Sequence, residues 1–269
     1  VLGWALRDLR TDDPFITYRF ADNLAQGRGF VFNPGDANPA LITTAPLYAL
    51  YLAGWRLLGL PTPVVSLVTS VVAILVGACA LEALGRRRDQ ALAGGLAGLV
   101  YVLFPLLWLT VGFETAMVLA LALSALWVAD AGRLRFSGVL AGLTIGLRGD
   151  GFLVAGLIGG LIVMRHLNAR PNAQASTLLR QLMDFAVPAV LVYSPVAIGL
   201  TWLFGSPLPT TLTTKSAQAL SGLTGFYPGT HYLEGALLLG RAYVTLTPIW
   251  WAALIGLAAG MIALATPPR

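Results

Sequence analysis

Long apolar runs separated by short polar loops dominate this sequence. The run 64–81 contains no charged residue and is the clearest membrane-spanning helix, because crossing a bilayer takes about 20 apolar residues. Further spans are predicted over 91–110, with Pro105 near its end, over 115–128, over 183–204 and over 235–265. The pattern therefore predicts an all-α polytopic membrane protein.

Two apolar runs, 136–147 and 151–164, are too short to cross a bilayer comfortably. Between them lie Arg148, Gly149 and Asp150. We expect a hairpin of short helices whose tip stops short of the far membrane surface and holds these charges at depth.

The segment 11–34 is the longest polar stretch of the chain. Asp12 and Asp13 precede Pro14, which is a strong helix start signal and predicts a short helix over 14–26. Apolar residues recur there at four-residue spacing, and polar residues occupy the other faces, so we expect a helix lying on the membrane surface. The apolar residues are Ile16, Phe20 and Leu24, and the polar ones are Tyr18, Arg19, Asp22 and Asn23. The run 47–58, which contains three aromatic residues, predicts a second interfacial helix.

Composition agrees with this class of protein. The chain has 269 residues, of which 57% are hydrophobic and only 11% charged, and its mean hydropathy is +0.77. We expect one transmembrane domain. Residues 1–10 would end a truncated first helix and residues 11–60 would form an external loop. Residues 61–265 would form the transmembrane helices, with a second external loop at 205–235. The C-terminus is expected to be truncated as well.

Cys79 is the only cysteine, so an intrachain disulfide and a thiolate metal site are excluded.

Basic residues gather in alternate loops. Arg86 to Arg88, then Arg133 and Arg135, then the loop after 164 are arginine-rich, and the positive-inside rule places these loops in the cytoplasm. The polar segment 11–34 then lies outside. The net charge of +5 therefore reflects topology and gives no indication of nucleic-acid binding.

The candidate functional residues are carboxylates, which could act as a base or bind a cation, and cationic side chains, which could bind phosphate. Asp12 and Asp13 suit a general base, or ligands for a divalent cation, although one could simply cap the helix. Arg148 could bind a phosphate group, and the alternative is a structural ion pair with Asp150.

Glu114 could face the same cavity as the other acidic residues or be an interfacial residue. Three further residues, alternatively ordinary surface residues, could also bind phosphate: Lys215, His231 and Arg241. The sequence contains no P-loop, no nucleotide-binding glycine fingerprint and no HExxH motif.

Four motifs resemble the GT-C glycosyltransferases, membrane enzymes that use polyprenyl-phosphate sugars outside the cytoplasm. They are DDPFITYRFADNLAQGRGFVFNPGD at 12–36, FETAM at 113–117, LRGDG at 147–151 and SPLPTTLTTKS at 206–216. The first is similar to bacterial arabinofuranosyltransferase-like members. We expect the chain to depart from that family in having an incomplete first helix and in lacking its later helices and C-terminal domain.

The resemblance implies that Asp12 or Asp13 is the catalytic base and that Arg148 and Lys215 lie near the donor phosphate. Arg241 is a further candidate phosphate ligand by its charge alone. We expect substrate contacts from a further set of polar residues: Tyr18, Arg19, Asn23, Glu114, Asp150 and His231. A divalent cation held by Asp12 and Asp13, with Glu114 or His231, is an open alternative, and no cofactor is required.

The function expected from these features is an integral membrane glycosyltransferase of the bacterial plasma membrane. It would move a sugar, such as arabinofuranose, from a polyprenyl-phosphate donor to a hydroxyl of a cell-envelope glycan or glycolipid on the extracytoplasmic side. A transporter or lipid-carrier flippase is the main alternative, since it would also place charges at membrane depth. A membrane scaffold without lipid-linked sugar binding is the third.

Overall fold

The computed structural model describes residues 13–36, 40–169, 174–207, 260 and 264. Within this part of the chain the named elements are all helices, which confirms the predicted all-α class. The chain order is α2 (Asp13–Ala25), α3 (Pro46–Leu57), α4 (Thr62–Arg87), α5 (Ala91–Leu103), α6 (Pro105–Leu109), α7 (Thr115–Asp130), α8 (Leu134–Leu147), α9 (Gly151–Ala169) and α10 (Ala175–Phe204). The predicted elements at 1–10, 208–235 and most of 235–265 fall outside the described residues.

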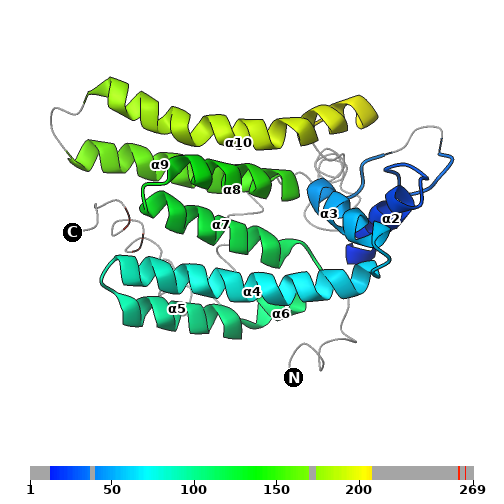
Figure 1. Ribbon diagram of the computed structural model, residues 1–269, viewed down its shortest axis with the longest axis horizontal. Coiled ribbons are helices and arrows are strands. Elements are labelled where there is room, and N and C mark those ends of the chain that lie inside the picture. Colours follow the sequence, from blue (N-terminus) through cyan, green and yellow to red (C-terminus); the bar gives the residue numbers. More distant parts are fainter. Residues whose placement is uncertain (1–12, 37–39, 170–173, 208–259, 261–263, 265–269) are drawn as a thin grey trace, which may run out of the picture.

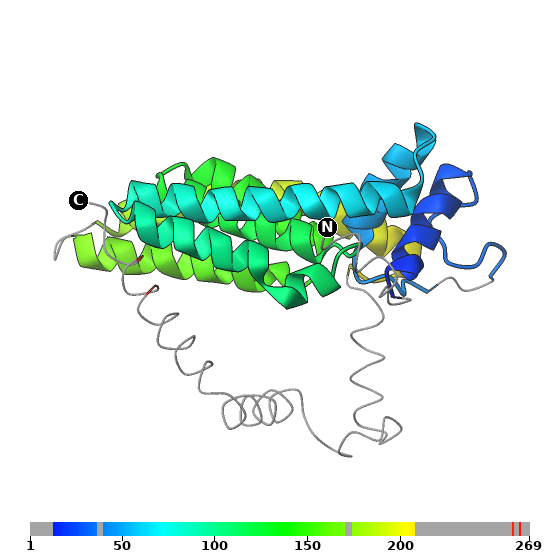
Figure 2. The ribbon, with the colours of Figure 1, turned by 90° about the horizontal axis from the view of Figure 1, so that it is seen from below.

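The longer helices form a bundle in which successive helices run in opposite directions (Figure 1). Helix α4 packs against α5 and α7, and α8 packs against α7 and α10. Helices α2 and α3 cover one end, where the α8–α9 turn and the start of α7 also lie (Figures 1 and 2). We call this the α2–α3 end. The opposite end, which we call the basic end, holds Arg86–Arg88, Asp130–Arg135 and Arg165.

Among the described residues three helices are long and apolar enough to cross a membrane: α4, α9 and α10. Helix α4 has 26 residues and contains the predicted run 64–81, which confirms that element. Its large aliphatic side chains Val68, Val72 and Leu75 are each more than half exposed. Such apolar exposure along a helix is what a lipid environment requires. The described chain is therefore an all-α membrane protein.

The predicted span 91–110 is wrong as a single helix. Helix α5 ends at Leu103 after 13 residues, and α6 starts at Pro105. Proline disfavours helical backbone in the residue before it, and Phe104 accordingly has an extended ψ of 114°. The indole Nε1 of Trp108 donates to the carbonyl of Val102 at 2.6 Å, which satisfies a backbone group that the break leaves free.

The predicted hairpin of short helices is correct for α8 and wrong for α9. Helix α8 has 14 residues, about 21 Å, whereas α9 has 19 and is long enough to span. Asp150, expected at membrane depth, has a side chain 51% exposed at the α2–α3 end of the bundle. Helix α10 also starts earlier than predicted, at Ala175 rather than 183.

The bounds of α2 agree with the predicted helix 14–26, but its faces do not. Tyr18 and Asn23 are predicted on the polar, solvent-exposed side, but they are buried, with only 6% and 5% of their surface exposed. The reason is that α2 packs against α3 and does not lie alone on a surface. Its buried face therefore includes polar side chains, each of which has a hydrogen-bond partner.

Glycines bring α8 and α10 into close contact. A Cβ on Gly138 would lie 2.1 Å from the carbonyl oxygen of Phe185, and one on Gly142 would lie 2.5 Å from that of Ala189. Small residues at such positions let two helix backbones approach, which is how helices pack within a membrane. This close contact with α10 holds α8, the helix that Arg148 directly follows.

We predict that Gly138→Ala lowers the free energy of unfolding by about 1–3 kcal/mol, because the methyl group overlaps the Phe185 carbonyl. The control is Gly156→Ala in α9, where no atom lies within 4 Å of the new Cβ and a stable or slightly stabilised protein is expected. Thermal and denaturant unfolding in detergent would measure both. Equal stability of the two variants would contradict the close α8–α10 packing.

Candidate functional site

Three charged side chains meet at the α2–α3 end of the bundle. Glu114 immediately precedes α7, Arg148 follows α8, and Asp150 precedes α9. Nη1 of Arg148 donates to Oε1 of Glu114 at 2.9 Å. Its Nε and Nη2 donate to the Asp150 carboxylate at 3.0–3.2 Å. We call these three residues the charged triad.

The two carboxylates of the triad differ in burial. The side chain of Glu114 is 6% exposed and that of Asp150 is 51% exposed, with the Arg148 side chain between them at 34%. Burial lowers the pKa of the Arg148 guanidinium, but its hydrogen bond to Asp150 and the charge of Glu114 outweigh burial and raise that pKa. Arg148 is therefore always charged, and the triad of one cation and two anions carries a net charge of −1.

The loop before Glu114 is fixed by hydrogen bonds to the backbone of Gly112. Its carbonyl oxygen accepts from the Tyr18 hydroxyl at 2.7 Å and from the Ser66 hydroxyl at 2.6 Å. Its N–H donates to Oγ of Ser70 at 3.1 Å. All backbone hydrogen-bonding positions of Gly112 are used. We call Gly112 with these partners the Gly112 node.

The node joins α2, α3 and α4. A serine hydroxyl has one hydrogen, and Ser66 donates it to Gly112, so the 2.8 Å contact between Tyr48 and Ser66 has the Tyr48 hydroxyl as donor. Burial raises the pKa of Tyr48 well above its usual range, so the phenol keeps this proton. Tyr18 comes from α2, Tyr48 from α3 and Ser66 from α4. Two residues downstream of Gly112, Glu114 is thereby placed beside Arg148.

Gly112 is required at this position. Its φ is +99°, in the region that favours glycine, and a Cβ would lie 3.0 Å from the Tyr18 hydroxyl. A side chain here would strain the backbone and displace a hydrogen-bond donor of the node.

The predicted substrate-binding residues of α2 have structural partners. Tyr18 belongs to the Gly112 node. Nδ2 of Asn23 donates to the carbonyls of Val31 and Phe32 at 2.9 and 3.0 Å, which closes the turn after α2. Arg19 is exposed, donates to Asn33 at 3.0 Å and stacks over the Phe32 ring at 4.4 Å. Their roles toward substrate stay predictions.

Asp13 is the first residue of α2 and is exposed. Asp12 lies outside the described residues. At 1.5 Å per residue, Asp13 is about 7.5 Å along the helix axis from Tyr18, which bonds directly to the node. Within the described part of the chain no three His, Cys, Asp or Glu side chains are grouped as a metal site. His231, Lys215 and Arg241 lie outside that part, so the predicted metal and phosphate roles that depend on them stay predictions.

Sequence reasoning identified all three residues of the charged triad but missed the residues that hold them. The aromatic pattern of 47–58 predicts only an interfacial helix for the segment that contains Tyr48, and no pattern indicates a role for Ser66, Ser70 or Gly112. Two signals are present in the sequence: hydroxyl side chains within apolar runs, and a glycine two residues before an acidic residue. The hydroxyls can be matched to the glycine only when α4 is known to pack against α7, and sequence spacing alone does not show this contact.

Comparison with known proteins gives one informative match. No family model matches the chain, and no solved structure matches it. The chain is similar to a glycosyltransferase. Over 138 residues, 47% of this chain, it is 32% identical to the terminal beta-(1->2)-arabinofuranosyltransferase of Mycobacterium tuberculosis (strain ATCC 25618 / H37Rv). The aligned region covers 22% of that protein, so the chain spans less than a quarter of the relative's length.

We predict that Gly112→Ala destabilises the protein more than Gly132→Ala does. Both glycines have positive φ, so each substitution costs roughly 1–2 kcal/mol of backbone strain. Only the first also displaces the Tyr18 hydroxyl, which adds about 1 kcal/mol for a lost hydrogen bond. Unfolding free energies in detergent measure the difference. If the two variants lose the same stability, the Gly112 node does not hold α2 to the bundle.

Proposed function

We propose that this chain is part of a membrane glycosyltransferase that moves a sugar from a polyprenyl-phosphate donor to an acceptor hydroxyl. The observation that carries the proposal is the charged triad, held by the Gly112 node at the end of a helix bundle that suits a bilayer. Similarity over 138 residues to an arabinofuranosyltransferase supports the same class of reaction.

The proposed reaction is a direct displacement. A carboxylate of Asp12 or Asp13 takes the proton of an acceptor hydroxyl, whose oxygen forms a bond to the anomeric carbon. The bond from that carbon to the phosphate oxygen breaks, and polyprenyl phosphate leaves with the electron pair. A cation near the leaving oxygens stabilises the charge that gathers there. Cleavage of the sugar phosphate provides the driving force, so no nucleotide is needed as an energy source.

Arg148 is the proposed phosphate ligand, and its present partners determine how it could act. The triad has a net charge of −1, so a phosphate would be repelled unless it replaced one carboxylate. Asp150 is the exchangeable partner, because it is half exposed and follows Arg148 after a single glycine. Buried Glu114 then keeps the guanidinium in position while its other edge binds two phosphate oxygens.

The proposed orientation follows from charge. The basic end of the bundle faces the cytoplasm by the positive-inside rule, so the charged triad faces outward. In that location the natural acceptor is a glycan or glycolipid of the cell envelope. Arabinofuranose is the sugar that the similar mycobacterial enzyme is named for, and it is the first donor sugar to test.

We predict that Asp12→Asn and Asp13→Asn, made singly, identify the base. The substitution that removes the base should lower the rate of transfer by about a hundredfold or more, while the other is tolerated. The assay follows radiolabelled sugar from decaprenyl-phosphate arabinose to an oligosaccharide acceptor. Full transfer by both variants would contradict the assignment of the base. Movement of donor across a proteoliposome membrane without transfer would favour a lipid-carrier flippase.

We predict opposite outcomes for the two acidic partners of Arg148. Glu114→Gln should lower kcat/KM for the donor by about tenfold or more, because it weakens the buried contact that holds the guanidinium. Asp150→Asn should keep kcat/KM within about fivefold, since an exposed ion pair contributes little. Asp184→Asn, at the basic end, is the control for a lost surface ion pair. The reverse order of effects would show that Asp150 and not Glu114 positions Arg148.

A further inference from the structure

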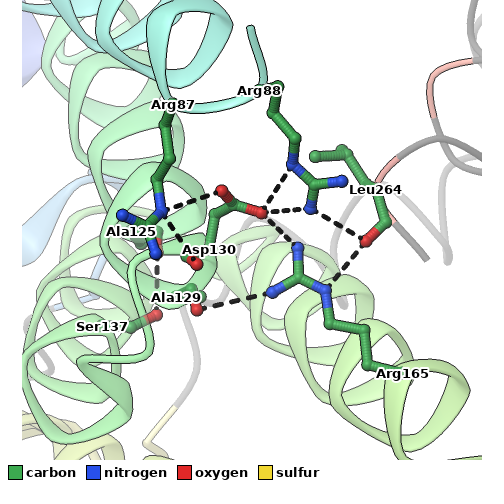
Figure 3. Close-up of polar contacts among 8 residues, drawn as sticks. All are labelled: Arg87, Arg88, Ala125, Ala129, Asp130, Ser137, Arg165 and Leu264. Carbon is green, nitrogen blue, oxygen red and sulfur yellow. Dashed lines mark hydrogen bonds and ion pairs between the residues drawn. The ribbon is translucent and has the colours of Figure 1, made fainter. Parts of the chain in front are cut away.

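A second charged cluster lies at the basic end, remote from the charged triad. Asp130, at the end of α7, has a fully buried side chain and is surrounded by Arg87, Arg88 and Arg165 (Figure 3). Arg88 donates Nε to Oδ1 of Asp130 at 3.0 Å, and Nη2 of Arg165 bonds to the same oxygen. Nε of Arg87 lies 3.2 Å from Oδ2 and donates to the backbone carbonyl of Asp130 at 3.1 Å. We call these four residues the Asp130 cluster.

The Asp130 cluster has an excess of positive charge. Three guanidiniums face one carboxylate, which leaves a net charge of +2. The carbonyl of Leu264 accepts from both Arg88 and Arg165, at 3.2 and 2.8 Å, but a carbonyl supplies no full negative charge. Two positive charges held together beside a buried carboxylate therefore still favour an anion.

Arg87 is the member of the cluster that can reach a ligand. Its side chain is 40% exposed, compared with 12% for Arg88 and 21% for Arg165. Within the described part of the chain its hydrogen bonding uses Nε alone, so both terminal nitrogens remain as donors. These two nitrogens match the spacing of phosphate oxygens.

The surroundings of the Asp130 cluster are apolar and exposed. Leu92, four residues after Arg88 and at the start of α5, is 78% exposed, and Leu167, two residues after Arg165 in α9, is 68% exposed. Acyl chains would cover such side chains, whereas a free phosphate ion would leave them in water.

Charge over the whole end agrees with a lipid surface. Among the described residues the basic end carries seven arginines and four carboxylates, a net of +3, and the α2–α3 end carries four arginines and five carboxylates, a net of −1. The first group is Arg86, Arg87, Arg88, Arg133, Arg135, Arg165 and Arg180 with Glu82, Asp89, Asp130 and Asp184; the second is Arg19, Arg28, Arg56 and Arg148 with Asp13, Asp22, Asp36, Glu114 and Asp150.

We infer that the Asp130 cluster binds the phosphate headgroup of an anionic phospholipid in the leaflet at the basic end. Arg87 supplies the exposed donors, and Asp130 holds Arg88 and Arg165 beside it. Basic pockets between the ends of membrane helices bind such headgroups through the same chemistry. This site is independent of the sugar-transfer proposal.

The test is a lipid titration of the 269-residue chain in detergent, with bound lipid counted by native mass spectrometry. Phosphatidylglycerol should bind about fivefold tighter, or better, than phosphatidylcholine with the same acyl chains. Arg87→Gln should lower the phosphatidylglycerol affinity by about fivefold. Arg135→Gln is the control, because Arg135 is an exposed arginine of the same end paired with Asp184 outside the cluster, and it should leave the affinity unchanged.

Three results would overturn the inference. Equal binding of the two lipids, or an Arg87→Gln variant that binds like the wild type, would exclude a headgroup site at the cluster. Displacement of phosphatidylglycerol by an equal concentration of inorganic phosphate would make free phosphate the ligand. Should Arg87→Gln fail to fold, Arg87→Lys keeps the charge without the two-pronged geometry, and it should still lower the affinity by about twofold.

Discussion

The backbone of Gly112 is the constraint on which the α2–α3 end depends, because its hydrogen bonds join α2 to α4, and α3 is attached through the Tyr48–Ser66 contact. Its carbonyl accepts from Tyr18 and Ser66, and its N–H donates to Ser70. Inside an apolar bundle each of these groups would be costly to leave without a partner, so the helices can pack only where all of them are satisfied. Glu114 follows two residues later, and its position beside Arg148 is a consequence of that packing.

The two ends of the bundle use buried carboxylates in opposite ways. At the α2–α3 end, Glu114 and Asp150 outnumber Arg148, so the guanidinium is held and its charge is more than balanced. At the basic end, Asp130 is outnumbered by three arginines, and positive charge remains. In our proposals one end exchanges a carboxylate for a substrate phosphate, and the other accepts an additional anion. Both depend on one buried acidic residue that fixes an arginine.

Much of this could be predicted from the sequence, because membrane helices have a strong compositional signal. The run now in α4, the short helix α2 and the grouping of charges in LRGD and FETAM were all visible. The apolar run predicts Pro105 near the end of one span, and this is wrong because Pro105 begins a new helix. The pattern predicts Tyr18 and Asn23 on a solvent-exposed polar face, but both are buried, because periodicity cannot reveal that a polar face packs against another helix. The partners of Gly112 and Asp130 come from helices distant in sequence, and only the tertiary contacts bring them together.

The most direct test of the central claim is a double-mutant cycle between Tyr18→Phe and Glu114→Gln, with the rate of sugar transfer from a polyprenyl-phosphate donor as the readout. If the Gly112 node positions Glu114 for Arg148, the two substitutions affect one unit, and their effects should differ from additivity by about 1 kcal/mol or more. Effects that add within about 0.5 kcal/mol would show that α2 and the charged triad act independently, which would contradict the account.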